Sequence, residues 1–109
     1  MTAEQNFNEL KRFVIMKLFI RDIVPDTYTN AAGFTLLTVL KNYFVSNQPI
    51  ILSFKDSTPP SSSFLNSSIG ELLDQFGFAH FKSIIKFTDL TATQVLVLKN
   101  YFSTCDTKS

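Results

Sequence analysis

The sequence has little cysteine and histidine, one of each, and no tryptophan among its 109 residues. A single cysteine, Cys105, excludes a disulfide within the chain and a zinc site built from several cysteines, and it suits a reducing compartment. No apolar run approaches the roughly 20 residues that a membrane-spanning helix needs, and no signal-peptide pattern opens the chain. We therefore expect a cytoplasmic protein that does not contact a membrane.

Charge and catalytic motifs are also scarce. The net charge of +1 gives no basic face for a nucleic acid. A glycine-rich phosphate loop, a G-x-S-x-G elbow and an H-E-x-x-H motif are all absent. Glu71 and Asp74 share a helix face that could hold a cation weakly, although such pairs are typical of a solvated surface. We therefore expect no enzyme, no metal and no cofactor.

His80 and Cys105 are the residues that nucleophilic catalysis would most readily use. They lie in different parts of the chain, so a Cys–His pair requires the fold to bring the tail to the loop after Gly77. We interpret them instead as a loop histidine and a free tail cysteine. A small enzyme that uses Ser62 or His80 is the least favoured class of function.

What the chain does contain is apolar residues, 45% of the total, against 17% charged residues. This composition indicates a globular chain, and the length fits one domain over residues 1–109 with a polar tail at 103–109. The 12 phenylalanines indicate an aromatic core. No internal repeat, linker or second domain is apparent.

The clearest pattern lies between Ile50 and Gly77. Residues 50–54 form a short apolar run that predicts a strand covered on both faces. Pro59 and Pro60 stop it, and three serines then offer N-caps to a helix over residues 64–76. Gly77 follows the last apolar residue, where a C-terminal position with positive φ favours glycine. The apolar stripe of this helix comprises Leu65, Ile69, Leu72, Leu73 and Phe76.

The remaining elements follow from the same periodicities. Residues 13–20 predict a strand that could run on to Val24, and residues 83–87 predict another. Cap-forming residues at 26–30 precede a helix whose stripe comprises Gly33, Leu36, Leu37, Leu40 and Phe44. Thr91 and Gln94 have the spacing of a capping box, which starts a last helix. Residues 1–11 are expected to be frayed. Long links between the strands favour right-handed crossovers and parallel neighbours.

Residues 50–56, followed after a spacer by residues 61–65, resemble the STAS-like domain family of unknown function. This family is related to the STAS domains of anti-sigma-factor antagonists and of sulfate-transporter tails. The resemblance implies an α/β fold: a single domain with a small mixed, largely parallel sheet of four to five strands and helices packed against it. Relatives often place an arginine near the start of the first long helix, but residues 29–32 of this chain contain none.

The resemblance also implies a site. In bacterial antagonists an Asp-Ser-Ser-Gly turn carries the serine that a partner kinase phosphorylates. Ser62 falls at that serine, Ser61 at the aspartate and Phe64 at the glycine. A serine at this turn, Ser63 included, would also cap the helix. A phosphate at the helix N-terminus would be tolerated and would change the surface charge.

We therefore expect a non-enzymatic module of the bacterial cytoplasm that binds a protein through Ser61, Ser62, Ser63 and Phe64, with Ser62 as phosphoacceptor. The expected partner is a histidine-kinase-type ATPase or another signalling protein. The alternative is a sensor of a small ligand, either a nucleotide or a lipid. An apolar pocket beside the turn would favour the sensor, whereas a flat exposed surface would favour the protein partner.

Overall fold

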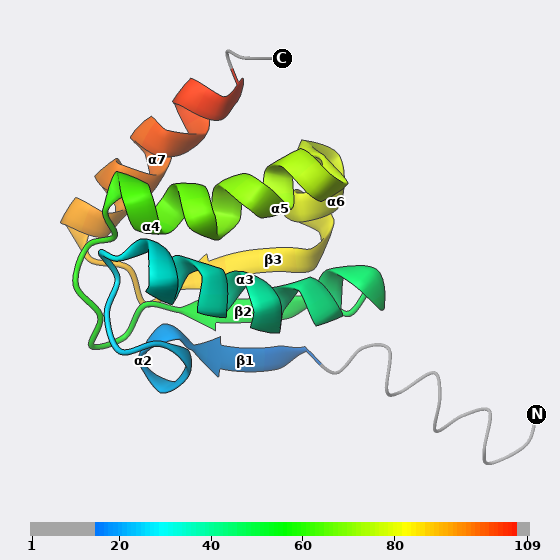
Figure 1. Ribbon diagram of the computed structural model, residues 1–109, viewed down its shortest axis with the longest axis horizontal. Helices are drawn as coiled ribbons and strands as arrows, with labels where there is room; N and C mark the ends of the chain where they lie inside the picture. Colours follow the sequence, from blue (N-terminus) through cyan, green and yellow to red (C-terminus); the bar gives the residue numbers. More distant parts are fainter. Residues whose placement is uncertain (1–14, 107–109) are drawn as a thin grey trace, which may run out of the picture.

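Three short parallel strands form the centre of the computed structural model, which describes residues 15–106 (Figure 1). Their order in the sheet is β1 (Met16–Phe19), β2 (Ile50–Ser53) and β3 (Ile85–Thr88). Met16 pairs with Ile50 and Ile50 pairs with Ile85, so β2 has a parallel neighbour on each side. The expectation of parallel neighbours, based on the long links between the strands, is therefore confirmed.

The first strand is shorter than predicted. It begins at Met16 and ends at Phe19, and residues 20–23 form the short helix α2 (Ile20–Ile23) instead of continuing it. Ile20, the first residue of α2, is fully buried. Phe13 and Val14 lie outside the described residues. Between residues 15 and 106 the sheet has three strands, all parallel, so the expected four to five strands and the mixed sheet are not confirmed.

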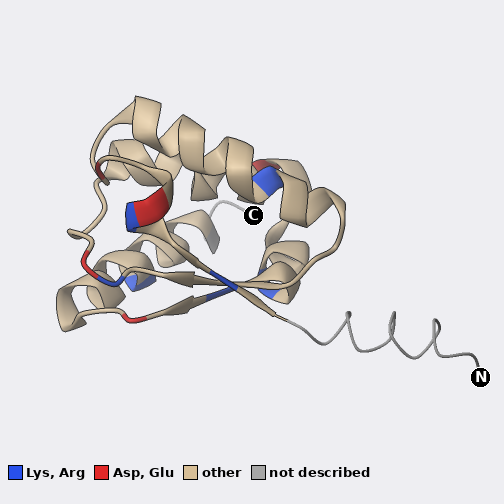
Figure 2. Ribbon diagram, turned by 90° about the horizontal axis from the view of Figure 1, so that it is seen from below, with Lys and Arg blue, Asp and Glu red and all other residues tan. Residues whose placement is uncertain are grey.

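Helices cover one face of the sheet. The longer ones are α3 (Asn30–Val45), α4 (Ser62–Ser67), α5 (Ile69–Phe76), α6 (Phe78–Ile84) and α7 (Ala92–Asp106). Figure 1 shows α3 beside the α4–α5 pair in front of the strands, and Figure 2 shows α3 on one side of the sheet. By register, Lys17, Ile51 and Lys86 form a row across the opposite face.

The helix predicted over residues 64–76 is two helices. It breaks at Ser68, whose backbone has φ −118° and ψ −82°. The hydroxyl of this buried serine donates a hydrogen bond to the Phe64 carbonyl at 2.7 Å, so it competes with the helical backbone ladder. Gly77 has φ +85° after α5, and the prediction of a positive φ there is confirmed.

Two predictions about the segment from Gly77 to Phe87 were wrong. The segment around Phe78 and Phe81, expected as a connection, is the helix α6, and it delays the start of β3 to Ile85. Phe81 and Ile84, three residues apart, are both buried on one face of this helix. In a strand, residues three apart would point to opposite faces of the sheet. Residues 103–106 of the predicted polar tail continue α7.

The core lies between the helical layer and the sheet. Leu52 of β2 and Leu72 of α5 belong to one buried cluster, as the apolar stripe of residues 65–76 predicts. The stripe of α3 contributes Leu36, Leu40 and Phe44 to the same cluster. Leu18 of β1 packs against this cluster, whereas Met16 at the start of the strand is exposed.

Candidate recognition site at the Ser61–Ser63 turn

Ser61 fixes the turn that leads into α4. Its hydroxyl accepts a hydrogen bond from the Phe64 N–H at 3.1 Å and donates one to the Tyr28 carbonyl at 2.9 Å. Its own N–H donates to the Thr27 carbonyl at 3.0 Å. Ser61 is thus the N-cap of α4 and also joins the turn to the loop before α3. Of the three serines predicted as possible caps, Ser61 is the one that caps the helix.

A second contact holds the two loops together. The Thr27 and Thr58 hydroxyl oxygens lie 2.7 Å apart, and the Thr27 hydroxyl also lies 3.0 Å from the Thr58 carbonyl. Buried Pro60 lies between Thr58 and the cap. The turn therefore presents a fixed backbone, because both its side chains and its main chain are hydrogen-bonded to a neighbouring loop.

Ser62 and Ser63 are exposed, as a phosphoacceptor or contact residue must be. Phe64 is fully buried in the core, so its side chain cannot form part of the contact surface to which we had assigned it. The reason is its position in the helix: α4 packs against α3, and Phe64 points inward. Because α4 has only six residues, its N-terminus also carries a weaker dipole than the long predicted helix would.

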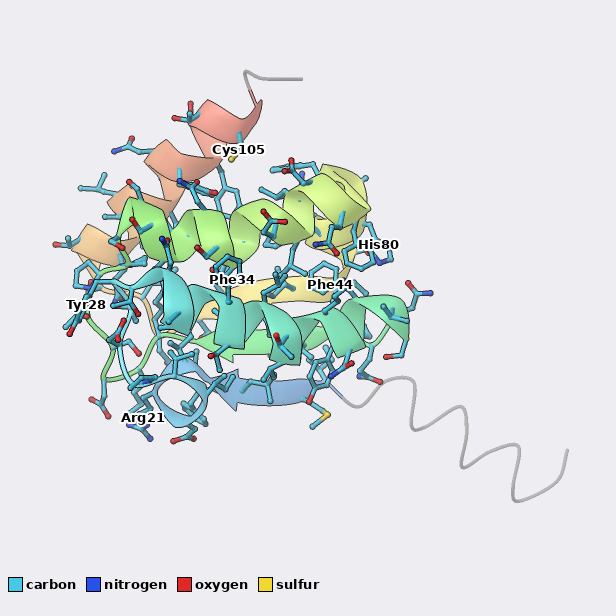
Figure 3. The ribbon with its side chains drawn as sticks, viewed as in Figure 1. Arg21, Tyr28, Phe34, Phe44, His80 and Cys105 are labelled. Atoms are coloured by element: carbon cyan, nitrogen blue, oxygen red, sulfur yellow. The ribbon has the colours of Figure 1, made fainter. Side chains whose placement is uncertain are left out.

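Two exposed aromatic side chains belong to the elements that flank the turn. Tyr28, whose carbonyl binds Ser61, is 65% exposed, and Phe34 on α3 is 53% exposed. The residue before Phe34, Gly33, packs directly against α4. Figure 3 shows Tyr28 at the loop end of the molecule and Phe34 at the α3–α4 side. We call Tyr28, Phe34, Ser62 and Ser63 together the turn surface.

A small polar cavity lies behind the turn, at the carboxyl ends of β1 and β2. Its volume is about 240 Å³, and Arg21, Asp56, Thr27 and Thr58 are among its lining residues. Arg21 forms an ion pair with Asp56 across it. The buried Ser57 hydroxyl, which also lines it, has no hydrogen-bond partner in the described part of the chain. Most of its lining residues are polar, so it is not the apolar pocket that we expected beside the turn of a ligand sensor.

The other candidate residues are kept apart. His80 lies on α6, where its Nε2 atom is 3.2 Å from the Phe44 carbonyl and its ring stacks on Phe76. Cys105 lies near the end of α7, and Figure 3 shows it well away from His80. The two therefore do not form a Cys–His pair. Within residues 15–106 no group of three His, Cys, Asp or Glu side chains is placed to hold a metal ion.

Glu71 and Asp74 line a hollow between α5 and α7 that also contains Tyr101 and Cys105. Burial is the main cause that raises the pKa of Tyr101, and the neighbouring Cys105 raises it further. The Tyr101 hydroxyl donates to the Asn66 side chain at 3.0 Å, which ties α7 to α4. These contacts account for the tyrosine as a structural residue.

Sequence reasoning did not identify Asp89, which follows β3 and contacts side chains of both β1 and β2. Its carboxylate accepts a hydrogen bond from the Ser53 hydroxyl at 2.5 Å and lies 3.2 Å from the Lys17 ammonium. The Ser53 hydroxyl lowers the pKa of Asp89 most, followed by the hydrogen bond from Lys17. Asp89 has φ +58°, which an aspartate tolerates better than most residues. An aspartate directly after a strand was the available signal.

Replacing Asp89 by asparagine is expected to flatten the acid limb of the stability curve. Because the folded-state pKa lies below the ordinary value of 3.8, the carboxylate stabilises the fold above that value and loses this effect as pH falls through the folded pKa. Urea unfolding of wild type and variant between neutral pH and about pH 2 measures the slope. Equal slopes below the ordinary pKa would contradict this role for Asp89.

Parallel strands with helical crossovers on one face define a small α/β domain, and comparison with known families makes the class more specific. Residues 36–95 match the family described as a STAS-like domain of unknown function. The match covers more than half of the 109 residues, and the chain therefore belongs to this family. It includes most of α3, the central strand and the Ser61–Ser63 turn.

No curated protein and no solved structure matches the chain significantly. Among the helices between residues 15 and 106, none combines the length and the apolar character of a membrane span. The family assignment therefore rests on the family comparison, and it agrees with the resemblance seen in residues 50–65.

Proposed function

We propose that this STAS-like domain is a non-enzymatic regulatory module of the bacterial cytoplasm that binds a partner protein through the turn surface. The observation that carries the proposal is the exposure of Ser62 and Ser63 on a turn that is hydrogen-bonded to Tyr28, whose side chain is itself largely exposed. Aromatic residues are enriched at the centres of protein interfaces, where they fill pockets of the partner. The partner class that this family resemblance favours is a signalling protein such as a histidine-kinase-type ATPase.

The rigid backbone of the turn supports the same proposal. Ser61 binds Phe64, Tyr28 and Thr27, so the serines that follow it are held at defined positions. A surface that is already ordered loses little conformational entropy when a partner docks. Preorganisation of this kind is useful for recognition, although it also stabilises the fold.

Phosphorylation of Ser62 would switch the contact. A kinase would transfer the γ-phosphoryl group of ATP to the Ser62 hydroxyl oxygen, with loss of the hydroxyl proton and release of ADP. The new group adds a charge of about −1.5 to −2 at neutral pH. Ser62 is the first residue of α4 and is exposed, so the phosphate would lie in the contact and not in the core. A partner docked on the turn surface would then be repelled, or a different partner attracted.

Substitution of Ser62 tests the switch. Ser62→Asp and Ser62→Ala should both fold normally, because Ser61 provides the cap and Ser62 is exposed. Ser62→Asp is expected to change the partners captured in pull-downs from the source cells, whereas Ser62→Ala should keep the wild-type pattern. Circular dichroism establishes that each variant is folded.

Two further variants sharpen this experiment. Thr93→Asp places the same charge on an exposed residue in the first turn of α7, and it should leave partner capture unchanged. Tyr28→Ala should weaken capture without unfolding the protein, since its side chain is largely exposed. If wild type, Ser62→Ala and Ser62→Asp all capture the same partners equally well, Ser62 is only a surface residue and the switch is wrong.

A small-ligand sensor is the second candidate function, and one observation favours it. The Ser57 hydroxyl, which has no hydrogen-bond partner between residues 15 and 106, lines the cavity at the carboxyl ends of the strands, where ligands of parallel α/β sheets commonly bind. At about 240 Å³ the cavity is smaller than the usual range for drug-sized ligands, so it suits a small polar molecule better than a nucleotide. Thermal-shift screening of wild type against Ser57→Ala would identify such a ligand.

A further inference from the structure

A second apolar surface lies away from the turn surface, between α6 and α7. Two adjoining hollows of about 500 Å³ and 350 Å³ open there and share Phe78, Phe87 and Phe102 in their walls. We call them together the α6–α7 groove. Phe87 of β3 lies in its floor, and β3 is at the edge of the described sheet.

The walls of the groove are apolar and partly exposed. Phe78 is 39% exposed and Val95 is 37% exposed, although both are large apolar side chains. The ring of Phe102 lies 6.1 Å from that of Phe78 and 6.0 Å from that of Phe87, measured between centroids. These mutual contacts hold the aromatic wall in place. Contiguous exposed apolar surface of this kind commonly marks an interaction site.

Among the described residues, the charged side chains that line the groove are positive. Lys82 lines one hollow and Lys99 the other, and neither has an acidic side chain in its described lining. The Lys82 ammonium lies 5.2 Å from the centroid of the Phe78 ring, so the cation stands directly beside the apolar wall. Glu71 and Asp74 line a different hollow, which also reaches Phe78. The charge pattern thus favours an occupant with apolar and acidic groups.

The shape of the groove selects among such occupants. It is shallow and open to solvent, whereas sites for small molecules usually enclose most of the ligand. Exposed Lys86 on β3 opposes the addition of another strand, since charged residues on edge strands discourage pairing. Two helices border the groove, and a third helix can place apolar side chains between them with i, i+3, i+4 and i+7 spacing.

We propose that the α6–α7 groove binds an amphipathic helix of a partner protein whose apolar stripe is flanked by aspartate and glutamate. The apolar side chains of that helix insert among Phe78, Phe87 and Phe102, and its carboxylates lie near Lys82 and Lys99. This interaction is separate from the turn surface and does not depend on the proposed role of Ser62.

Selection from a phage-displayed library of random peptides tests the proposal. Peptides of about 16 residues span more than four helical turns, which is enough for a complete apolar stripe. Purified full-length protein is expected to enrich peptides that combine acidic residues with leucine or phenylalanine at helical spacing. On binding, the amide resonances of residues in α6, β3 and α7 should shift in NMR spectra. Absence of enrichment, enrichment of basic peptides, or shifts confined to other elements would overturn the proposal.

Charge reversal at the rim provides the quantitative test. The double variant Lys82→Glu/Lys99→Glu should weaken binding of the selected peptide about tenfold or more, because like charges then face each other across the contact. Lys41→Glu is the control for charge reversal away from the groove, since Lys41 is an exposed lysine on α3. It should bind the peptide as wild type does. Ser62→Asp should also bind normally. Equal affinity of all these variants would contradict the proposal.

Two other occupants are distinguished in the same study. Analytical ultracentrifugation should show a monomer at the concentrations used for binding, and a stable dimer with Phe78 and Phe102 at its interface would overturn the proposal. Vesicles that contain palmitate are expected not to compete with the peptide. Competition by them would assign the groove to an anionic lipid and not to a helix.

Discussion

Replacing Leu72 by alanine is expected to lower the free energy of unfolding by about 2–5 kcal/mol. Leu72 is fully buried in α5 and shares the core cluster with Leu52 of the central strand. The variant loses the transfer free energy of the removed carbon atoms, and the surrounding side chains cannot fully close the cavity that remains. Chemical denaturation of wild type and variant measures the difference.

Leu96→Ala is the matched control, because Leu96 is 62% exposed on α7. The same chemical change at a surface position should alter stability by no more than about 0.5 kcal/mol. If Leu72→Ala lost as little as Leu96→Ala, the wrong face of α5 would have been placed in the core. The assignment of the recognition turn would then fail too, because the packing of α5 helps to position α4.

Replacing Gly33 by alanine is expected to destabilise the protein by about 1–3 kcal/mol, or more if α3 and α4 cannot separate. A Cβ atom at Gly33 would lie 2.6 Å from the Ser67 Cβ and 2.7 Å from the Phe64 carbonyl oxygen. Neither atom can move without the backbone of α4. The better helix propensity of alanine, worth about 1 kcal/mol, offsets only part of the overlap. Thermal and urea unfolding measure the net effect.

Gly70→Ala makes the same change at a position with a yielding neighbour. Its Cβ would meet the Tyr101 hydroxyl at 2.5 Å, which is the far end of a side chain that can rotate. The expected change is small, because the gain in helix propensity of about 1 kcal/mol is offset by a weakened Tyr101–Asn66 hydrogen bond of similar worth. If Gly33→Ala were as mild as Gly70→Ala, the close approach of α3 and α4 would be wrong.

Much of the fold could be predicted because local chemistry determines it. Thr91 and Gln94 form the reciprocal bonds of a capping box at 3.1 Å and 2.9 Å, as their spacing predicts. Thr29 caps α3 from the polar loop expected before that helix. The apolar run at residues 50–54 predicted a strand covered on both faces. The strand and its parallel neighbours are confirmed, but in the described part of the chain helices cover only one face of the sheet, and Ile51 on the other face is partly exposed.

What could not be predicted depends on contacts between distant residues. No local sequence pattern indicates the break at Ser68, since serine is tolerated in helices. The break arises where α4 packs on α3. The end of the first strand at Phe19 follows from the burial of Ile20. For the recognition site, the serine cap was visible in the sequence. The exposure of Tyr28 and Phe34 and the burial of Phe64 were not, because periodicity does not show which aromatic residues remain outside the core.

The central position of β2 has a consequence for how the chain is made. Its first neighbour, β1, precedes it, but its second neighbour begins at Ile85, 35 residues after Ile50. At ordinary rates of translation those residues take about 2–7 s to synthesise. During that interval the most apolar strand of the protein has one edge without a partner. Any tendency of this domain to aggregate should therefore depend on the speed of the ribosome and on chaperones, more than on the stability of the finished fold.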